Sequence, residues 1–186
     1  MRIVGGIHRG RPIKAPEGLD VRPTSDRVRQ ALFNVLEHGN LAKNGNPVVD
    51  AVVLDTFSGT GALAIEALSR GAASAICMDN NQKVIEQIRE NAVSLSEISR
   101  IKVLLADATK PPRASISANL IFMDPPYGLE LAELALTALL ASNWISKDAI
   151  VVVETGSSEA FNAIDGFTIC DQRKYGRTAL TFLRAH

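Results

Sequence analysis

From residue 52 onward the sequence alternates short apolar runs with amphipathic stretches, and this alternation restricts the possible folds more than any other feature. The apolar runs predict strands, and the stretches between them have the periodicity of helices. Strands that are joined by helices form a parallel sheet with crossover connections. We therefore predict an α/β protein with a doubly wound, mostly parallel sheet. The expected strands span residues 52–55, 74–79, 101–105, 120–123 and 149–154, and the expected helices span residues 61–70, 82–95 and 129–142.

The last part of the chain predicts an antiparallel pair of strands. Residues 166–170 and 178–183 alternate apolar and polar side chains, and a basic turn at residues 173–177 separates them. We expect this pair to complete the sheet on one side. Trp144, which follows the last predicted helix, is expected to cover the core below the end of that helix.

The first 40 residues have a different pattern. Residues 2–7 and 12–15 flank a basic tip that contains Gly10, which predicts a β-hairpin. A helical period follows, with Thr24 or Ser25 as the N-cap and Gly39 as the stop. We therefore divide the chain into a basic N-terminal arm of hairpin and helix, residues 1–40, which packs on a main domain of residues 48–186.

Charge is distributed unevenly along the chain. Lys plus Arg and Asp plus Glu number 20 each, so the net charge of zero does not predict a nucleic-acid partner. Residues 1–30, however, hold seven basic and three acidic residues, and the rest of the chain is acidic to the same extent. This asymmetry favours an arm that contacts phosphates, although a solvated basic surface would look the same. The candidate RNA contacts are Arg2, His8, Arg9, Arg11, Arg22, Thr24, Arg27 and Arg29.

The two cysteines and the apolar runs exclude several classes of protein. Cys77 and Cys170 lie in apolar runs without metal-site spacing, so we expect reduced core residues and no metal. No apolar run is long enough to span a membrane, and residues 1–14 lack the apolar region of a signal peptide. We therefore expect a cytoplasmic protein without a membrane partner.

The segment Asp124-Pro125-Pro126-Tyr127 follows the fourth predicted strand. Ligands bind at this carboxyl edge in open α/β sheets. Proline fixes φ, lacks an N–H group and favours extended geometry in the residue before it, so the segment offers rigid acceptors. Taken alone, the segment is also compatible with a diproline turn that the aspartate caps.

Rigid acceptors of this kind fit an exocyclic amine of a nucleobase. If the Asp124 carboxylate and the Pro125 carbonyl each accept one N–H, the nitrogen lone pair can be directed at an electrophile. Tyr127 is expected to stack on the base, a contact worth about 1 to 3 kcal/mol in single-stranded nucleic-acid sites. The candidate catalytic residues are therefore Asp124, Pro125, Pro126 and Tyr127.

A glycine-containing segment, residues 55–61, follows the first predicted strand and opens a helix. Glycine lets the backbone approach a ligand closely, and a helix amino end offers N–H groups. Gly59, Gly61 and Ala64 satisfy the G-x-G-x-x-G/A pattern of dinucleotide-binding proteins, and Asp79 ends the next strand 20 residues after Gly59. A nicotinamide-dependent enzyme is therefore one interpretation.

Asp55 favours a different cofactor. Its charge would lie beside the pyrophosphate of a dinucleotide, which is unfavourable. S-adenosylmethionine has no phosphate and carries an ammonium group that an acid can bind. Asp79 can then accept the ribose hydroxyls, and Asp107 the adenine amine. The expected cofactor contacts are Asp55, Phe57, Ser58, Gly59, Gly61, Asp79, Asn80, Asp107, Ala108 and Asp124.

These residues together resemble a class I S-adenosylmethionine-dependent methyltransferase, and more closely the bacterial enzymes that methylate the exocyclic N2 of a guanine in 16S ribosomal RNA. The resemblance implies a seven-stranded Rossmann-like sheet with an antiparallel last strand. It also implies 16S ribosomal RNA as the partner, within a small-subunit particle. The segments that carry the resemblance are residues 2–6, 22–34, 55–72 and 122–127, whereas Gln30, Asp79 and Arg177 depart from the family's usual residues.

Three other interpretations stay open on the sequence. The Asp-Pro-Pro-Tyr motif equally suits adenine-N6 methyltransferases that act on DNA or RNA. A nucleic-acid-binding protein without turnover and an NAD-binding oxidoreductase are less favoured. The sequence does not determine the oligomeric state, and we expect a monomer.

Overall fold

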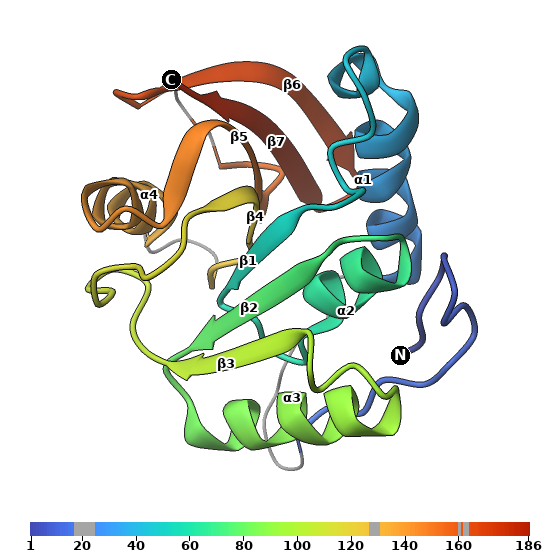
Figure 1. The fold of residues 1–186 in the computed structure, drawn as a ribbon. Helices are drawn as coiled ribbons and strands as arrows, with labels where there is room; N and C mark the ends of the chain where they lie inside the picture. Colours follow the sequence, from blue (N-terminus) through green and yellow to red (C-terminus); the bar gives the residue numbers. More distant parts are fainter. Residues whose placement is uncertain (17–24, 127–130, 160, 162–163) are drawn as a thin grey trace.

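The computed structural model describes residues 1–16, 25–126, 131–159, 161 and 164–186 (Figure 1). Its centre is a seven-stranded sheet with the order β3-β2-β1-β4-β5-β7-β6, in which β7 pairs antiparallel with both of its neighbours. The strands are β1 Val52–Thr56, β2 Ser74–Asp79, β3 Ile101–Leu105, β4 Ala118–Met123, β5 Ile145–Gly156, β6 Phe167–Tyr175 and β7 Thr178–Ala185. The predicted doubly wound sheet is confirmed.

Helices cover both faces of this sheet and produce two hydrophobic cores. Strand residues alternate between the faces, so neighbouring residues of one strand enter different cores. Side chains of α1, α2 and α3 pack on one face, where the Phe33 and Phe122 rings lie 5.6 Å apart. Helix α4 covers the other face (Figure 1), and its side chains pack in the second core. The helices are α1 Asp26–His38, the 3₁₀ turn η1 Asn40–Ala42, α2 Ala62–Ser69, α3 Gln82–Ser94 and α4 Leu131–Ala141.

Strand β5 begins at Ile145, four residues before the predicted start. Its pairing with β4 shifts register, so Ala118 pairs with Ile145 and Leu120 with Ile150. The additional residues include Asp148, which has a positive φ of 62°. These polar residues and the irregular pairing interrupt the apolar pattern. The first part of β5 could therefore not be predicted from that pattern.

The N-terminal segment forms less β-structure than predicted. Helix α1 has Ser25 as its N-cap, whose hydroxyl accepts the Val28 N–H at 3.2 Å. The expected hairpin, by contrast, is a single antiparallel bridge between Arg2 and Pro12. Turns replace the strands because the chain passes close to the end of α2. A Cβ atom on Gly6, whose φ is +72°, would lie 1.9 Å from the Ser69 carbonyl oxygen.

Three isolated predictions have different outcomes. Trp144 is buried directly after α4 and its Nε1 donates to the Pro112 carbonyl at 2.8 Å, as expected of a residue that covers the core. Cys77 is buried, but Cys170 is exposed, so the core prediction for Cys170 was wrong. Cys170 is the extra residue of a bulge between β6 and β7, which removes it from the alternation. None of the helices in the described ranges is long and apolar enough to cross a membrane.

Candidate active site

The strand register brings three predicted acids to one edge of the sheet. Asp55 lies in β1, directly before its last residue, and Asp79 is the last residue of β2. Asp124 follows directly after β4. Because β2, β1 and β4 are adjacent and parallel, their carboxyl ends lie side by side.

Asp55 is the most enclosed of the three acids. It is only 2% exposed, and its Oδ2 accepts the backbone N–H of Ala64 in α2 at 3.0 Å. Burial raises the pKa of Asp55 well above its ordinary value, and the Ala64 hydrogen bond offsets part of the shift. The charges of Asp124 and Asp79 raise the pKa of Asp55 further. The fold therefore holds like charges close together at this edge.

Asp79 is tied to the loop that follows β1. Its Oδ2 accepts the Gly59 N–H at 3.1 Å and its Oδ1 accepts the Asn81 N–H at 3.0 Å. Burial raises the pKa of Asp79, and hydrogen bonds from the backbone of Asn81, Gly59 and Asn80 oppose that shift. A carboxylate at this strand end thus fixes the position of the glycine-containing loop.

The loop itself has the backbone geometry that its glycines allow. Gly59 and Gly61 have φ values of 53° and 74°, and Phe57 also has a positive φ of 58°. A Cβ atom on Gly61 would lie 3.3 Å from the Ile88 side chain, so α3 leaves little room there. The Ser58 hydroxyl lies 2.5 and 3.0 Å from the carbonyl oxygens of Asp55 and Met78, in the ends of β1 and β2, and its single O–H is shared between them. Ser58 therefore holds the loop together by its side chain.

The loop after β3 contributes a more exposed acid, Asp107. Its Oδ1 accepts both the N–H and the hydroxyl of Thr109, at 2.8 and 2.7 Å. These hydrogen bonds lower the pKa of Asp107, so the exposed carboxylate is ionised at neutral pH. Ala108 beside it is buried.

The Asp-Pro-Pro segment directly follows β4, at the carboxyl edge of the sheet. Asp124 is half-buried, Pro125 is buried and Pro126 is exposed. Tyr127, the predicted stacking residue, lies outside the described residues. The catalytic assignments of these four residues stay predictions.

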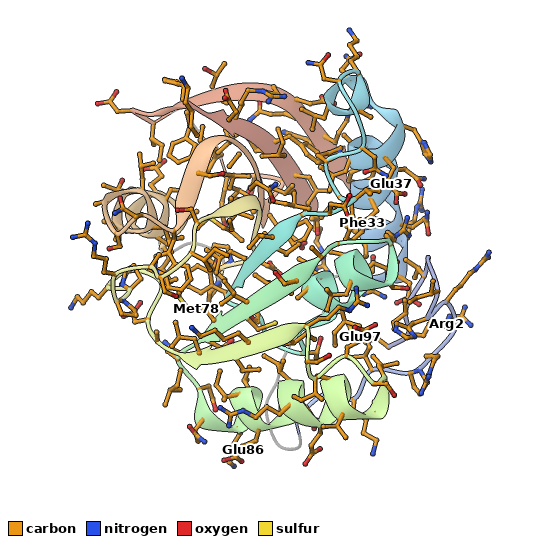
Figure 2. The ribbon with its side chains drawn as sticks, viewed as in Figure 1. Arg2, Phe33, Glu37, Met78, Glu86 and Glu97 are labelled. Atoms are coloured by element: carbon orange, nitrogen blue, oxygen red, sulfur yellow. The ribbon has the colours of Figure 1, made fainter. Side chains whose placement is uncertain are left out.

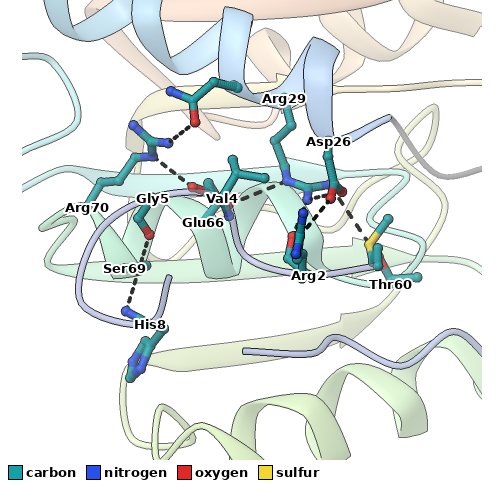
Figure 3. Close-up of polar contacts among 12 residues, drawn as sticks. Arg2, Val4, Gly5, His8, Asp26, Arg29, Thr60, Glu66, Ser69 and Arg70 are labelled. Carbon is teal, nitrogen blue, oxygen red and sulfur yellow. Dashed lines mark hydrogen bonds and ion pairs between the residues drawn. The ribbon is translucent and has the colours of Figure 1, made fainter. Parts of the chain in front are cut away.

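Arg29 contradicts the expectation that it binds RNA, because its side chain is completely buried (Figure 3). Its guanidinium points from α1 toward α2, where Nε lies 3.5 Å from Glu66 Oε2. Nη2 donates to the Arg2 carbonyl and, at 2.9 Å, to Asp26 Oδ1. Arg29 thus connects α1 both to the N-terminal segment and to α2.

His8 is also used inside the protein. Its Nε2 lies 2.6 Å from Glu97 Oε1, and 13% of the His8 side chain is exposed. Although burial raises the pKa of Glu97, hydrogen bonds from Arg100 and His8 lower it overall. His8 therefore offers little surface to RNA.

The other arm residues keep accessible surface. Arg2 projects outward from the arm, with 72% of its side chain exposed, and pairs with Asp26 at 3.5 Å (Figure 2). Arg11 Nη2 donates to the Ser94 carbonyl at 2.6 Å. Arg9 and Arg27 are exposed. Arg22 and Thr24 lie outside the described residues.

Comparison with known proteins assigns the chain to a family. The family model described as "Conserved hypothetical protein 95" matches residues 1–184. A ribosomal RNA small subunit methyltransferase D of Escherichia coli (strain K12) is 35% identical over 156 residues, which cover 83% of this chain and 74% of that relative. The protein of the same name from Haemophilus influenzae is 32% identical and covers 95% of this chain and 89% of that relative. The chain belongs to this ribosomal RNA methyltransferase family.

Solved structures agree with membership of the methyltransferase family. A putative methyltransferase, yhhF, from Escherichia coli has a TM-score of 0.82 and 31% identity, with 100% of this chain and 98% of that chain covered. A putative methylase, HI0767, from Haemophilus influenzae has a TM-score of 0.77 and 26% identity, with 99% and 97% covered. An RNA methyltransferase from Salinibacter ruber, in complex with S-adenosyl-L-homocysteine, shares the fold at 17% identity and a TM-score of 0.64, with 88% and 93% covered.

In this member of the methyltransferase family, a fifth acid lies at the same edge as Asp55, Asp79, Asp107 and Asp124 and was not predicted as a site residue. Glu154 lies near the end of β5, beside β4, and is 5% exposed. The signal was present in the sequence, because Glu154 ends the apolar run at residues 149–153 as Asp55 and Asp79 end theirs. The sequence pattern predicts it only as the last residue of a strand.

Proposed function

We propose that the protein transfers a methyl group from S-adenosylmethionine to the exocyclic N2 amine of a guanine in 16S ribosomal RNA of the small subunit. The observation that carries this proposal is the position of Asp124 and Pro125, which directly follow β4 beside the buried Asp55. Family membership supports ribosomal RNA methylation. The guanine N2 atom and the small-subunit particle are the finer part of the proposal.

The residues at the sheet edge fit a cationic cofactor. Asp55 is buried near two other carboxylates, and a positive ligand relieves this repulsion. S-adenosylmethionine carries an ammonium and a sulfonium group, and it lacks the phosphates that Asp55 would repel. When bound, it supplies a methyl group on an electrophilic sulfonium. The donor set thus favours this cofactor over a dinucleotide.

Each loop at the edge has a separate part in holding the cofactor. Asp55 binds the ammonium group, Asp79 accepts the ribose hydroxyls, and Asp107 accepts the adenine amine. A carboxylate has about four acceptor sites, so Asp79 can bind ribose while it still accepts the Gly59 and Asn81 N–H groups. The remaining proposed contacts come from the backbone or apolar surface of Phe57, Ser58, Gly59, Gly61, Asn80 and Ala108.

Asp124 and Pro125 hold the target amine. The carboxylate and the carbonyl each accept one N–H, which directs the nitrogen lone pair at the methyl carbon. The amine becomes strongly acidic only after it is methylated, so its proton can leave late, to water or to Asp124. The chain needs alignment and acceptors at this position, and it does not need a strong base.

The exposed part of the arm is the proposed RNA surface. Arg2, Arg9, Arg11 and Arg27 are exposed basic residues near the N-terminal end of the chain and of α1. They contact phosphates around the target, and activity falls as the salt concentration rises. A paired base is inaccessible, so the target is unstacked or flipped into the site, where Tyr127 stacks on it.

A labelling experiment tests the proposal. The protein is incubated with methyl-labelled S-adenosylmethionine and unmethylated small subunits, naked 16S RNA or DNA, and the labelled nucleoside is identified. We expect N2-methylguanosine from the small-subunit substrate, and no label with the Asp124→Ala variant. N6-methyladenosine would replace the guanine assignment by the adenine alternative. Absence of transfer to every substrate would contradict an enzymatic role.

A further inference from the structure

Glu154 lies beside Asp124 in the register of the sheet. Met123 pairs with Val153, so Asp124 and Glu154 are the next residues of two neighbouring parallel strands. Adjacent strands are about 4.8 Å apart. The two acids therefore lie side by side on adjacent strands, at the level where the proposed target amine is held.

The two acids also lie on the same face of the sheet. Phe122 in β4 and Val152 in β5 both pack in the core beneath α1, α2 and α3. Side chains two residues apart point to the same face of a strand, and the proline after Asp124 favours extended geometry at that residue. Asp124 and Glu154 consequently extend from the same face, at the edge.

Glu154 is almost fully buried, which is unusual for a carboxylate near the end of a strand. Its exposed fraction is 5%, and an ionised group at such a position needs hydrogen-bond donors. Both Glu154 and Asp124 interact with other groups in the unbound protein. Because each carboxylate has about four acceptor sites, both can accept further N–H groups from a ligand.

The hydrogen-bonding edge of guanine fits two neighbouring acids, and that of adenine does not. Guanine presents the N1–H donor directly beside the N2 amine, so its Watson–Crick edge offers donors side by side. Adenine presents the N1 lone pair beside its N6 amine. A carboxylate oxygen next to Asp124 can accept guanine N1–H, whereas adenine offers it no donor at N1.

We propose that Glu154 is a specificity-determining residue, which accepts the N1–H of the target guanine while Asp124 and Pro125 hold the N2 amine. The inference rests on the proposed function and adds to it a physical basis for the choice of guanine over adenine. In this proposal Glu154 contacts the substrate, whereas Asp55 and Asp79 bind the cofactor.

A base analogue separates N1 recognition from amine recognition. The nucleotide that wild-type protein modifies is first mapped, and synthetic RNA is then prepared with guanine or 2-aminopurine at that position. 2-Aminopurine keeps the 2-amino group but has a lone pair at N1. We expect wild-type protein to prefer guanine by about 10- to 100-fold in kcat/KM, the scale of one good base contact. Equal turnover of the two bases by wild-type protein would overturn the proposal without any variant.

The Glu154→Gln variant then assigns the preference to this residue. The glutamine amide can donate to N1 of 2-aminopurine, so the preference for guanine should fall at least about tenfold relative to wild type. 2-Aminopurine also lacks O6, and for that reason the change in preference between the two proteins is the informative quantity. S-adenosylmethionine affinity and thermal unfolding are measured on the same samples, to confirm a folded, cofactor-binding variant.

Thr155→Val is the matched control. Thr155 is the next residue of β5, points to the opposite face, and its buried Oγ1 has no hydrogen-bond partner among the residues that the structure describes. Its replacement should leave the preference for guanine unchanged. An unchanged preference in Glu154→Gln, with N2-methylguanosine as the wild-type product, would overturn the role of Glu154 alone. A wild-type product other than N2-methylguanosine would overturn the proposed function itself.

Discussion

Two groups of buried charges in this protein are arranged in opposite ways. Between α1 and α2, Arg29 and Arg70 both pair with Glu66, at 3.5 and 2.9 Å (Figure 3). Arg70 also pairs with Glu37, at 2.6 Å. We call these four residues the arm network. At the carboxyl edge of the sheet, burial raises the pKa of Asp55, and the charges of Asp124 and Asp79 raise it further. We call these three residues the edge acids.

This difference distinguishes charges that stabilise the fold from charges that are available to bind a ligand. In the arm network each charge has a partner of opposite sign, and the pairs join α1 to α2. In the edge acids like charges are held together at a cost in stability. We expect such repulsion between like charges to serve function. Substitutions that remove it should raise the stability of the unbound protein and reduce its activity.

The largest predicted effect is the loss of methyl transfer in Asp124→Ala. Removal of one acceptor from the target amine should lower kcat by about 10²- to 10³-fold, because a preorganised polar contact is lost. S-adenosylmethionine should still bind, since Asp55 and Asp79 remain. Single-turnover transfer and equilibrium cofactor binding measure the two quantities. Near-normal turnover would show that the Asp-Pro-Pro segment does not hold the amine.

Within the arm network, Arg29→Met should lower the free energy of unfolding by about 3 to 5 kcal/mol, because Glu66 loses one partner in a buried position. Urea denaturation measures this change. Arg27→Met is the matched control, since Arg27 is exposed on the same helix, and its stability should change by less than about 0.5 kcal/mol. Equal effects of the two substitutions would mean that the buried ion pairs do not stabilise the fold.

Among the edge acids, a change of charge should act in the opposite direction. Asp55→Asn should raise the free energy of unfolding of the unbound protein at pH 7 by about 0.5 to 2 kcal/mol. The sign follows from linkage. Between the ordinary aspartate pKa of about 3.9 and the raised pKa of Asp55, the folded state binds more protons, so stability falls as the pH rises. The cost grows as the pH rises from the ordinary pKa toward the raised pKa of Asp55, and asparagine removes it.

The same Asp55→Asn variant should bind S-adenosylmethionine more weakly, because the cofactor's ammonium group loses its partner. Asp148→Asn, an exposed acid near the start of β5, is the control and should alter neither quantity. A loss of stability in unbound Asp55→Asn would show that the carboxylate serves the fold, as the arm network does.

The smallest predicted effect concerns the exposed surface of the arm. Arg9→Ala should weaken RNA binding a few-fold and reduce the slope of log affinity against log salt concentration by about 0.7 to 0.9, the value for one phosphate contact. Filter binding at several salt concentrations measures the slope. The protein's stability should stay the same, in contrast with Arg29→Met. An unchanged slope would remove Arg9 from the RNA surface.

Much of the fold could be predicted because local patterns determine it. The predicted strands at residues 74–79 and 101–105 match β2 and β3 at both ends. Ser25 and Gly39 limit α1 as their chemistry predicts. The errors occurred where long-range packing determines the structure. The N-terminal segment, for example, packs against the end of α2 and forms turns, where the local pattern predicts a hairpin.

The candidate site was less predictable, because charge pairing depends on elements that are far apart in sequence. Arg29 shares a helical face with Leu32, Phe33 and Leu36, which in retrospect indicates burial. Its partner Glu66 lies 37 positions further along the chain, in an otherwise apolar helix. No local pattern joins these two residues, and composition alone therefore assigned Arg29 to the RNA surface.

The pH dependence of S-adenosylmethionine binding tests most directly whether the edge acids are kept for a cation. A cationic ligand favours ionised Asp55, so affinity should fall as the pH is lowered through the raised pKa of Asp55, with proton release on binding in that range. Asp55→Asn should bind weakly and with a flatter pH profile. Affinity that is independent of pH in the wild-type protein, or that rises on acidification, would contradict the account.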